Sequence, residues 1–197
     1  MRIPTMAAAA AVATTMAAGG AALAQGVPPQ FVVSGKAAEQ IQDFTTINLA
    51  TAERIAEVCE REAAKEGVQI SISILDNDGN DVYKDRMDGQ GYLNIVTADM
   101  KAKTALMSRT SSKVRMNEVL KDPEQMELRQ YQLGMFPNSG GLPIVVNHQL
   151  IGVVGVGGSA PKPPVWSDEI CAHRALTEVI GASVPPLIED QIGRAHV

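Results

Sequence analysis

The amino-acid sequence predicts an α+β fold in which helices cover a central antiparallel sheet. Apolar residues recur at three- and four-residue steps in separate segments, and two pairs of strand-like segments flank short polar turns. These patterns follow one another as helix, hairpin, helix, hairpin, helix. Strands joined by tight turns pair antiparallel, so we expect the helices to pack on the faces of one sheet.

The first helix and hairpin are expected between residues 49 and 84. The apolar side of the helix comprises Leu49, Ala52, Ala56, Cys59 and Ala63. Gly67 follows this series and is typical of a residue that ends a helix. Residues 68–75 alternate as a strand, with isoleucines 70, 72 and 74 on one face and serines 71 and 73 on the other. An acidic turn at 76–81 leads to a return strand that begins at 82–84.

Two further helices are expected before the second hairpin. Residues 95–108 place small apolar side chains on one face, and residues 114–120 form a short helix that stops before Pro123. The face of the longer helix comprises Ile95, Ala98, Ala102 and Ala105.

The second hairpin joins residues 142–146 to residues 149–156 through the two-residue turn of Asn147 and His148. Ser167 or Asp168 is expected to cap the last helix. The apolar side of that helix comprises Ala172, Ala175, Leu176 and Val179.

The two ends of the chain are expected to lie outside the folded domain. Arg2 precedes an alanine-rich apolar run, and Ala22-Leu23-Ala24 fits signal peptidase, so residues 1–24 are predicted to be a signal peptide. Residues 25–44 then form an N-terminal extension and residues 45–191 the domain. Residues 192–197 read as the translation of a common sequencing-adapter sequence, so we expect them to be foreign. The predicted location is periplasmic or secreted, with no membrane span after cleavage.

The net charge of the chain is −5, and it becomes −7 without Arg2 and Arg194 of the two ends. An acidic protein is not suited to bind nucleic acid or an anionic membrane surface. The short basic stretches Lys101–Lys103 and Lys113–Arg115 are interpreted as solvated helix faces.

The motifs for common chemistries are incomplete. Gly155–Ala160 imitates a dinucleotide fingerprint, but a proline-rich segment follows where a helix is needed, so these glycines are interpreted as sites of close packing. Asp76, Asp78 and Asn80 imitate the start of a calcium loop, but Asp81 stands where its glycine is needed and Met87 where its closing glutamate is needed, so a tight turn is favoured instead. His148 and His173 lie in no nucleophile or zinc motif. We therefore predict no catalytic residues and no metal site.

Several segments together resemble one family. They are Leu49–Glu53, Ile72–Asp76, Gly79, Arg86–Gly89, Lys101–Ala102, Gly140–Ile144, Gly152–Val156 and Asp168. In their order and spacing, over residues 46–182, the chain resembles the GlcG/HbpS family, from which it departs by an insert at 124–138. The resemblance implies a profilin-like α-β-α sandwich that is commonly a homo-oligomer. Some members bind haem, one branch is an extracellular haem-responsive partner of a two-component sensor, and others accompany glycolate or diol metabolism.

The residues shared with the family have two interpretations. In the functional one, five of them converge on a pocket for a small anion or a haem propionate. They are Arg86, Asp88, Lys101, Gly140 and Gly141. In the structural one, the glycines turn the backbone into a strand and the charged side chains pair with loops.

The leading hypothesis is an exported, non-catalytic module that binds haem or a related tetrapyrrole as a homo-oligomer. A haem iron needs an axial side chain. The candidates are His173, His148, Tyr83, Tyr92, Met126 and Met135. The alternatives are an enzyme or accessory protein that acts on a small hydroxy acid or aldehyde, and a structural oligomer without ligand.

The two cysteines, Cys59 and Cys171, could form a disulfide or remain separate thiols. In a profilin-like sandwich the terminal helices pack beside each other, which would bring Cys59 towards Cys171 in the first turn of the last helix. An oxidising compartment would then allow a disulfide, provided that the Cα atoms lie within about 7 Å. The alternative is two separate buried thiols.

Overall fold

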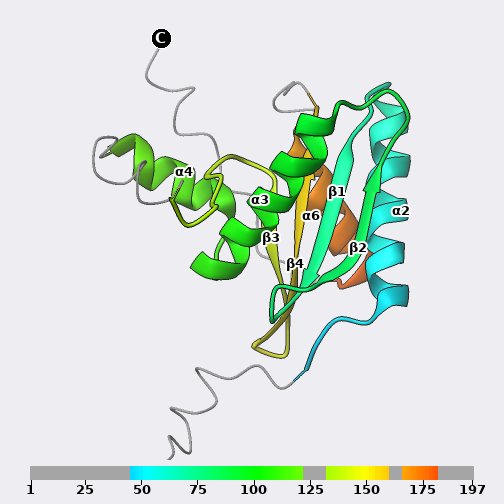
Figure 1. Cartoon of the computed structure of the whole chain (residues 1–197). Coiled ribbons are helices and arrows are strands. Elements are labelled where there is room, and N and C mark those ends of the chain that lie inside the picture. Colours follow the sequence, from blue (N-terminus) through cyan, green and yellow to red (C-terminus); the bar gives the residue numbers. More distant parts are fainter. Residues whose placement is uncertain (1–44, 122–131, 160–165, 182–197) are drawn as a thin grey trace, which may run out of the picture. The chain divides into compact units, whose positions relative to one another are not determined.

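A computed structural model describes residues 45–121, 132–159 and 166–181. These residues form a four-stranded antiparallel sheet in the order β2-β1-β4-β3, with helices packed against both faces (Figure 1). The expected α+β sandwich is thus confirmed. The predicted signal peptide, the extension up to residue 44 and the foreign tail lie outside the described residues, as does Met126.

Helix α2 spans Leu49–Lys65 and begins where the Asn48 side chain accepts a hydrogen bond from the Thr51 backbone amide at 2.8 Å. It is followed by Gly67, whose φ of +67° fits the predicted end of the helix. The predicted apolar side is buried except for Leu49, which occupies the first helical position and is 52% exposed.

The sheet consists of β1 (Ser71–Asp76), β2 (Asp81–Arg86), β3 (Gly141–Val146) and β4 (Gln149–Gly157). The isoleucines of β1 lie in the core that α2 and α6 cover. Ser71 and Ser73, which alternation placed on a polar face, are also buried, because α3 covers that side of the sheet. The Ser73 hydroxyl donates to Asp99 of α3 at 3.2 Å.

Both predicted hairpin turns are confirmed. One carboxylate oxygen of Asp76 accepts hydrogen bonds from the backbone amides of Asp78 at 2.9 Å and Asn80 at 2.8 Å, which closes the acidic turn. In the second hairpin, Asn147 and His148 have φ angles of +49° and +65°, as a two-residue turn that matches the strand twist requires.

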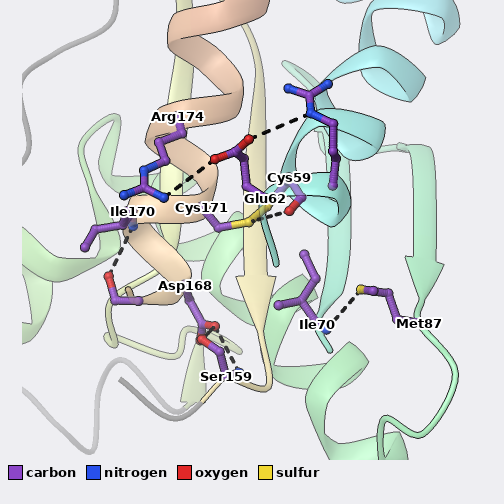
Figure 2. Close-up of a disulfide and its surroundings, with 11 residues drawn as sticks. Cys59, Glu62, Ile70, Met87, Ser159, Asp168, Ile170, Cys171 and Arg174 are labelled. Carbon is purple, nitrogen blue, oxygen red and sulfur yellow. Dashed lines mark hydrogen bonds and ion pairs between the residues drawn. A yellow bond between two sulfur atoms is a disulfide. The ribbon is translucent and has the colours of Figure 1, made fainter. Parts of the chain in front are cut away.

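Helices α2 and α6 (Asp168–Val179) pack together on one face of the sheet, and a disulfide joins them. The Cα atoms of Cys59 and Cys171 are 5.2 Å apart, and both residues are fully buried (Figure 2). Ser167 is the residue that caps α6, since its hydroxyl accepts a hydrogen bond from the Ile170 amide at 3.1 Å.

Helix α3 (Tyr92–Ser108) covers the opposite face at very short range, and α4 (Ser112–Lys121) packs against α3 and β3. A Cβ atom added to Gly155 would lie 2.0 Å from the carbonyl oxygen of Ala98, and one added to Gly157 would lie 2.7 Å from that of Asn94. The glycines of β4 therefore permit close helix packing, as predicted. Within the described residues, no helix has the length and hydrophobicity needed to cross a membrane.

Candidate functional site

The candidate site lies at the end of the sheet where β2 and β4 finish and β1 and β3 begin. The strand register brings Ser71 opposite both Arg86 and Gly157, and Gly141 opposite Gly155. The starts of α3, α4 and α6 supply further side chains near this end. Polar residues that are distant in sequence therefore meet there.

Lys101 and the two glycines of the predicted site come together. A Cβ atom added to Gly141 would lie 2.2 Å from the backbone oxygen of Lys101. One added to Gly140 would lie 2.6 Å from the backbone oxygen of Val156, 2.8 Å from Cβ of Asp168 and 3.3 Å from Cδ of Lys101. Gly140 also has a φ of +124°, which side-chain-bearing residues rarely adopt. Gly141 is thus needed for β3 to start against α3, and Gly140 for the backbone to pass close to β4 and α6.

Lys101 is only 4% exposed and forms a buried ion pair with Asp168. Its Nζ lies 2.7 Å from Oδ2 of Asp168 and donates to the backbone oxygen of Val156 at 3.0 Å. The other oxygen of Asp168 accepts from the backbone amide of Ser159 at 3.1 Å and from the hydroxyl of Ser159. Because α3 and α6 pack on opposite faces of the sheet, this pair links the two helix layers.

A second buried pair lies beside the first. Nζ of Lys113 in α4 is 3.6 Å from Oε2 of Glu169, the residue that follows Asp168 in α6. Glu169 also accepts hydrogen bonds from the hydroxyls of Ser111 at 2.8 Å and Ser139 at 2.9 Å. The two lysines and two carboxylates form a cluster, hereafter the buried charge cluster, comprising Lys101, Lys113, Asp168 and Glu169.

The interpretation of both basic stretches as solvated faces is wrong for one residue of each. Lys101 and Lys113 are buried, at 4% and 8% exposure, whereas Lys103 is exposed and Arg115 is partly exposed. Residues two apart on a helix point about 200° away from each other, so one of each pair faces inward. Sequence reasoning also missed Glu169, because an acid in the first helical turn is normally a solvated one.

Arg86, the last residue of β2, and Asp88, in the connection between β2 and α3, lie at the same end of the sheet and are exposed. The Arg86 guanidinium donates to the backbone oxygen of Gln90, and the Gln90 amide donates to the backbone oxygen of Gly158 at 3.4 Å. Gly158 precedes Ser159, the partner of Asp168. Arg86 is thus connected to the buried charge cluster through Gln90, and the convergence of Arg86 and Asp88 with Lys101 on one ligand stays a prediction.

The candidate iron ligands are scattered over the described residues. His148 is exposed in the turn between β3 and β4, and His173 is half-buried on α6. Tyr92 opens α3 and is 80% exposed, whereas Met135 is 3% exposed in the core. Tyr83 on β2 is half-buried, and burial raises its pKa, as do Asp85 and the acidic residues of α2.

Comparison with known proteins gives a consistent answer. The family model described as haem degrading protein HbpS-like matches residues 47–177. An uncharacterised 15.0 kDa protein from the dhaT-dhaS intergenic region of Citrobacter freundii is 30% identical over 138 residues, which are 68% of this chain and 93% of that protein.

Two solved structures illustrate the similarity in fold. Klebsiella pneumoniae protein ORFY is 28% identical, with a TM-score of 0.64 over 77% of this chain and 99% of that chain. The complex of PduOC with haem is 20% identical, with a TM-score of 0.61 over 72% of this chain and 98% of that chain.

Proposed function

Since the chain belongs to the HbpS-like family, in the GlcG/HbpS group that its sequence resembles, we propose that it binds haem or a closely related tetrapyrrole. The observation that carries this proposal is the extent of the family match, residues 47–177, which covers nearly all of the described domain. The likeness of the fold to PduOC, which was solved as a haem complex, supports the same ligand class.

Among the candidate ligands that lie in the described residues, the environment favours three. A haem iron takes a histidine, a methionine or a tyrosinate, and the side chain must reach the iron. Met135 is enclosed in the core, and the raised pKa of Tyr83 disfavours its tyrosinate form. Tyr92, His148 and His173 are therefore the side chains to test first.

We also propose that the protein works outside the cytoplasm and assembles with copies of itself. A disulfide between fully buried cysteines is consistent with an oxidising compartment, as is the signal-like start of the sequence. Assembly is supported by large apolar side chains that α3, α4 and the segment before β3 leave exposed. These are Tyr92, Leu93, Met107, Leu120 and Leu133.

The test is a titration of the exported, processed protein with hemin. We expect a saturable shift of the Soret band at a fixed ratio of haem to protein. Variants Tyr92→Phe, His148→Ala and His173→Ala are compared with the parent, and the variant that lacks the iron ligand should change the band position and weaken binding. A spectrum that stays equal to that of hemin in buffer, at every protein concentration, would overturn the proposal.

A further inference from the structure

We propose that the Cys59–Cys171 disulfide shields Lys101 and Lys113 by fixing the first turn of α6, so that reduction of the bond opens the buried charge cluster. The inference concerns the cluster itself and does not depend on which ligand the protein binds. It follows from the position of one sulfur relative to two carboxylates.

Cys171 shares the first turn of α6 with both acids of the cluster. Its backbone amide donates to the carbonyl of Ser167, the residue that caps the helix, at 3.0 Å. Asp168 and Cys171 are three residues apart, a spacing that places side chains on neighbouring positions of a helix. In Figure 2 the disulfide and the Asp168–Ser159 contact accordingly lie close together at the same end of α6.

The disulfide and the acids hold this turn from different sides. Through Cys59 the turn is attached to α2, on one face of the sheet, whereas Asp168 and Glu169 reach lysines of α3 and α4. The ionic ties between α2 and α6 lie further along α6, where Arg174 is 3.6 Å from Glu62 and Glu178 contacts Arg54 and Arg61 through half-exposed side chains. Such surface pairs restrain a helix only weakly.

Buried ion pairs need this restraint more than other contacts do. Removing two charges from water is costly, and their attraction offsets that cost only when the geometry is very good. The separation of 2.7 Å between Lys101 and Asp168 meets the condition, and that of 3.6 Å between Lys113 and Glu169 is already looser. A small displacement of the turn would therefore favour hydration of the lysines over continued pairing.

The redox step is an ordinary thiol–disulfide exchange with an external dithiol. A thiolate of the dithiol attacks one sulfur of the Cys59–Cys171 bond, and a mixed disulfide forms. The second thiol of the reagent then displaces the protein sulfur and closes the reagent into a cyclic disulfide. Two electrons and two protons pass to the protein, which ends with two thiols. Since both cysteines are fully buried, the attack requires α2 and α6 to separate locally.

The test measures the reactivity of each lysine amine. The complete processed protein, free of haem, is treated with formaldehyde and a borane reductant, before and after reduction by a dithiol, and dimethylation is quantified by peptide mass spectrometry. We expect labelling of Lys101 and Lys113 to become about tenfold faster on reduction, as for a locally opened segment. The exposed amines of Lys65 and Lys103 serve as internal references and should change less than about twofold.

Two variants separate this effect from general loosening. Cys59→Ala with Cys171→Ala should reproduce the faster labelling without any reductant. Glu178→Gln cuts ties between the same two helices at the other end of α6 and should leave Lys101 and Lys113 protected.

Two results would overturn the proposal. One is unchanged protection of both lysines in protein whose two thiols are shown to be free. The other is a collapse of amide hydrogen-exchange protection in β4 on reduction, because the bond would then hold the whole fold and not one turn. If the double cysteine variant does not fold, the labelling rates of Lys101 and Lys113 in the reduced parent protein test the proposal by themselves. Failure to bind hemin would affect neither result.

Discussion

The two helix layers are attached to the same sheet by opposite means. On one face, α2 and α6 bury aliphatic side chains, share a disulfide and exchange ion pairs at the surface between Arg174 and Glu62 and around Glu178. On the other face, α3 lies so close to β4 that glycine is required there, and the lysines of α3 and α4 are buried. The first layer gains stability from apolar burial and from a covalent bond that fixes the first turn of α6 against α2. The second depends on precise distances.

This difference explains how the buried charge cluster is maintained between the two layers. Buried charges are retained only where rigid surroundings fix their partners. The layer of α2 and α6 supplies that rigidity to the first turn of α6, and the acids of this turn extend it to α3 and α4. The four predictions below test the contrast, from the largest expected effect to the smallest.

Removal of the disulfide should cost the most stability. For Cys59→Ala with Cys171→Ala, the bond that closes a loop of 112 residues is lost, and we expect the free energy of unfolding to fall by about 4 kcal/mol. Urea denaturation of the oxidised parent, the reduced parent and the double variant measures it. The reduced parent and the double variant should be equally stable. If the oxidised parent were no more stable than they are, the disulfide would not stabilise the layer of α2 and α6.

Breaking the buried ion pair should cost nearly as much. Lys101→Met leaves the carboxylate of Asp168 buried without its cation, so we expect a loss of about 4 kcal/mol in unfolding free energy. Lys101→Met combined with Asp168→Asn should restore a large part of it, because no charge is then left buried. The matched control is Lys103→Met, which removes an exposed partner of Asp99 and should cost less than about 1 kcal/mol. Equal costs for Lys101→Met and Lys103→Met would contradict the importance of burial.

A single methyl group should disturb the α3 side. Gly155→Ala places a Cβ atom 2.0 Å from the carbonyl oxygen of Ala98, so α3 must move away from β4, and we expect a loss of about 3 kcal/mol. Thermal unfolding followed by circular dichroism checks this. Gly91→Ala is the control, since a Cβ atom there meets nothing within 4 Å and the φ angle of −75° suits alanine. Similar melting temperatures for both variants would mean that α3 is not held at close range.

The elements of this fold were predictable because each carries its own periodicity. The isoleucines of β1, the glycine after α2 and the two-residue turn at Asn147 all follow local rules, and their positions in the structure match. The alternation of apolar and polar residues in β1 did not reveal that Ser71 and Ser73 are also buried, under α3. A second buried face of a strand depends on a helix that is distant in sequence.

The candidate site was predictable only in part. Gly140, Gly141 and Lys101 were found through a family resemblance, and the structure brings them together. Lys113 and Glu169 were missed because an isolated charged residue on a helix is normally solvated. Lys113 is buried in the structure, where α4 packs against α3 and β3. The hydrogen bonds that connect Arg86 through Gln90 to Gly158 could not be predicted from the sequence either, since they depend on strand register.

The smallest predicted effect concerns an acid on the α2 side. Burial raises the pKa of Glu60 to about 7, and the charge and hydrogen bonding of Asp85 and the charge of Glu57 add to the rise. The folded protein therefore holds this proton more tightly than the unfolded chain does. The resulting stability is complete below pH 4.5, the ordinary pKa, and is lost as the pH rises through about 7.

Glu60→Gln should remove this pH dependence, because the amide stays uncharged. At pH 4 the variant and the parent should be equally stable, whereas at pH 8 the variant should be more stable by about 1 kcal/mol, a figure reduced for the solvent that screens a partly exposed group. Urea denaturation at a series of pH values measures the difference. Glu53→Gln, which removes the same charge from an exposed position of α2, is the matched control variant. If Glu60→Gln were more stable than the parent by the same amount at pH 4 and at pH 8, the gain would come from packing and not from the proton. Burial of Glu60 would then not destabilise its charged form.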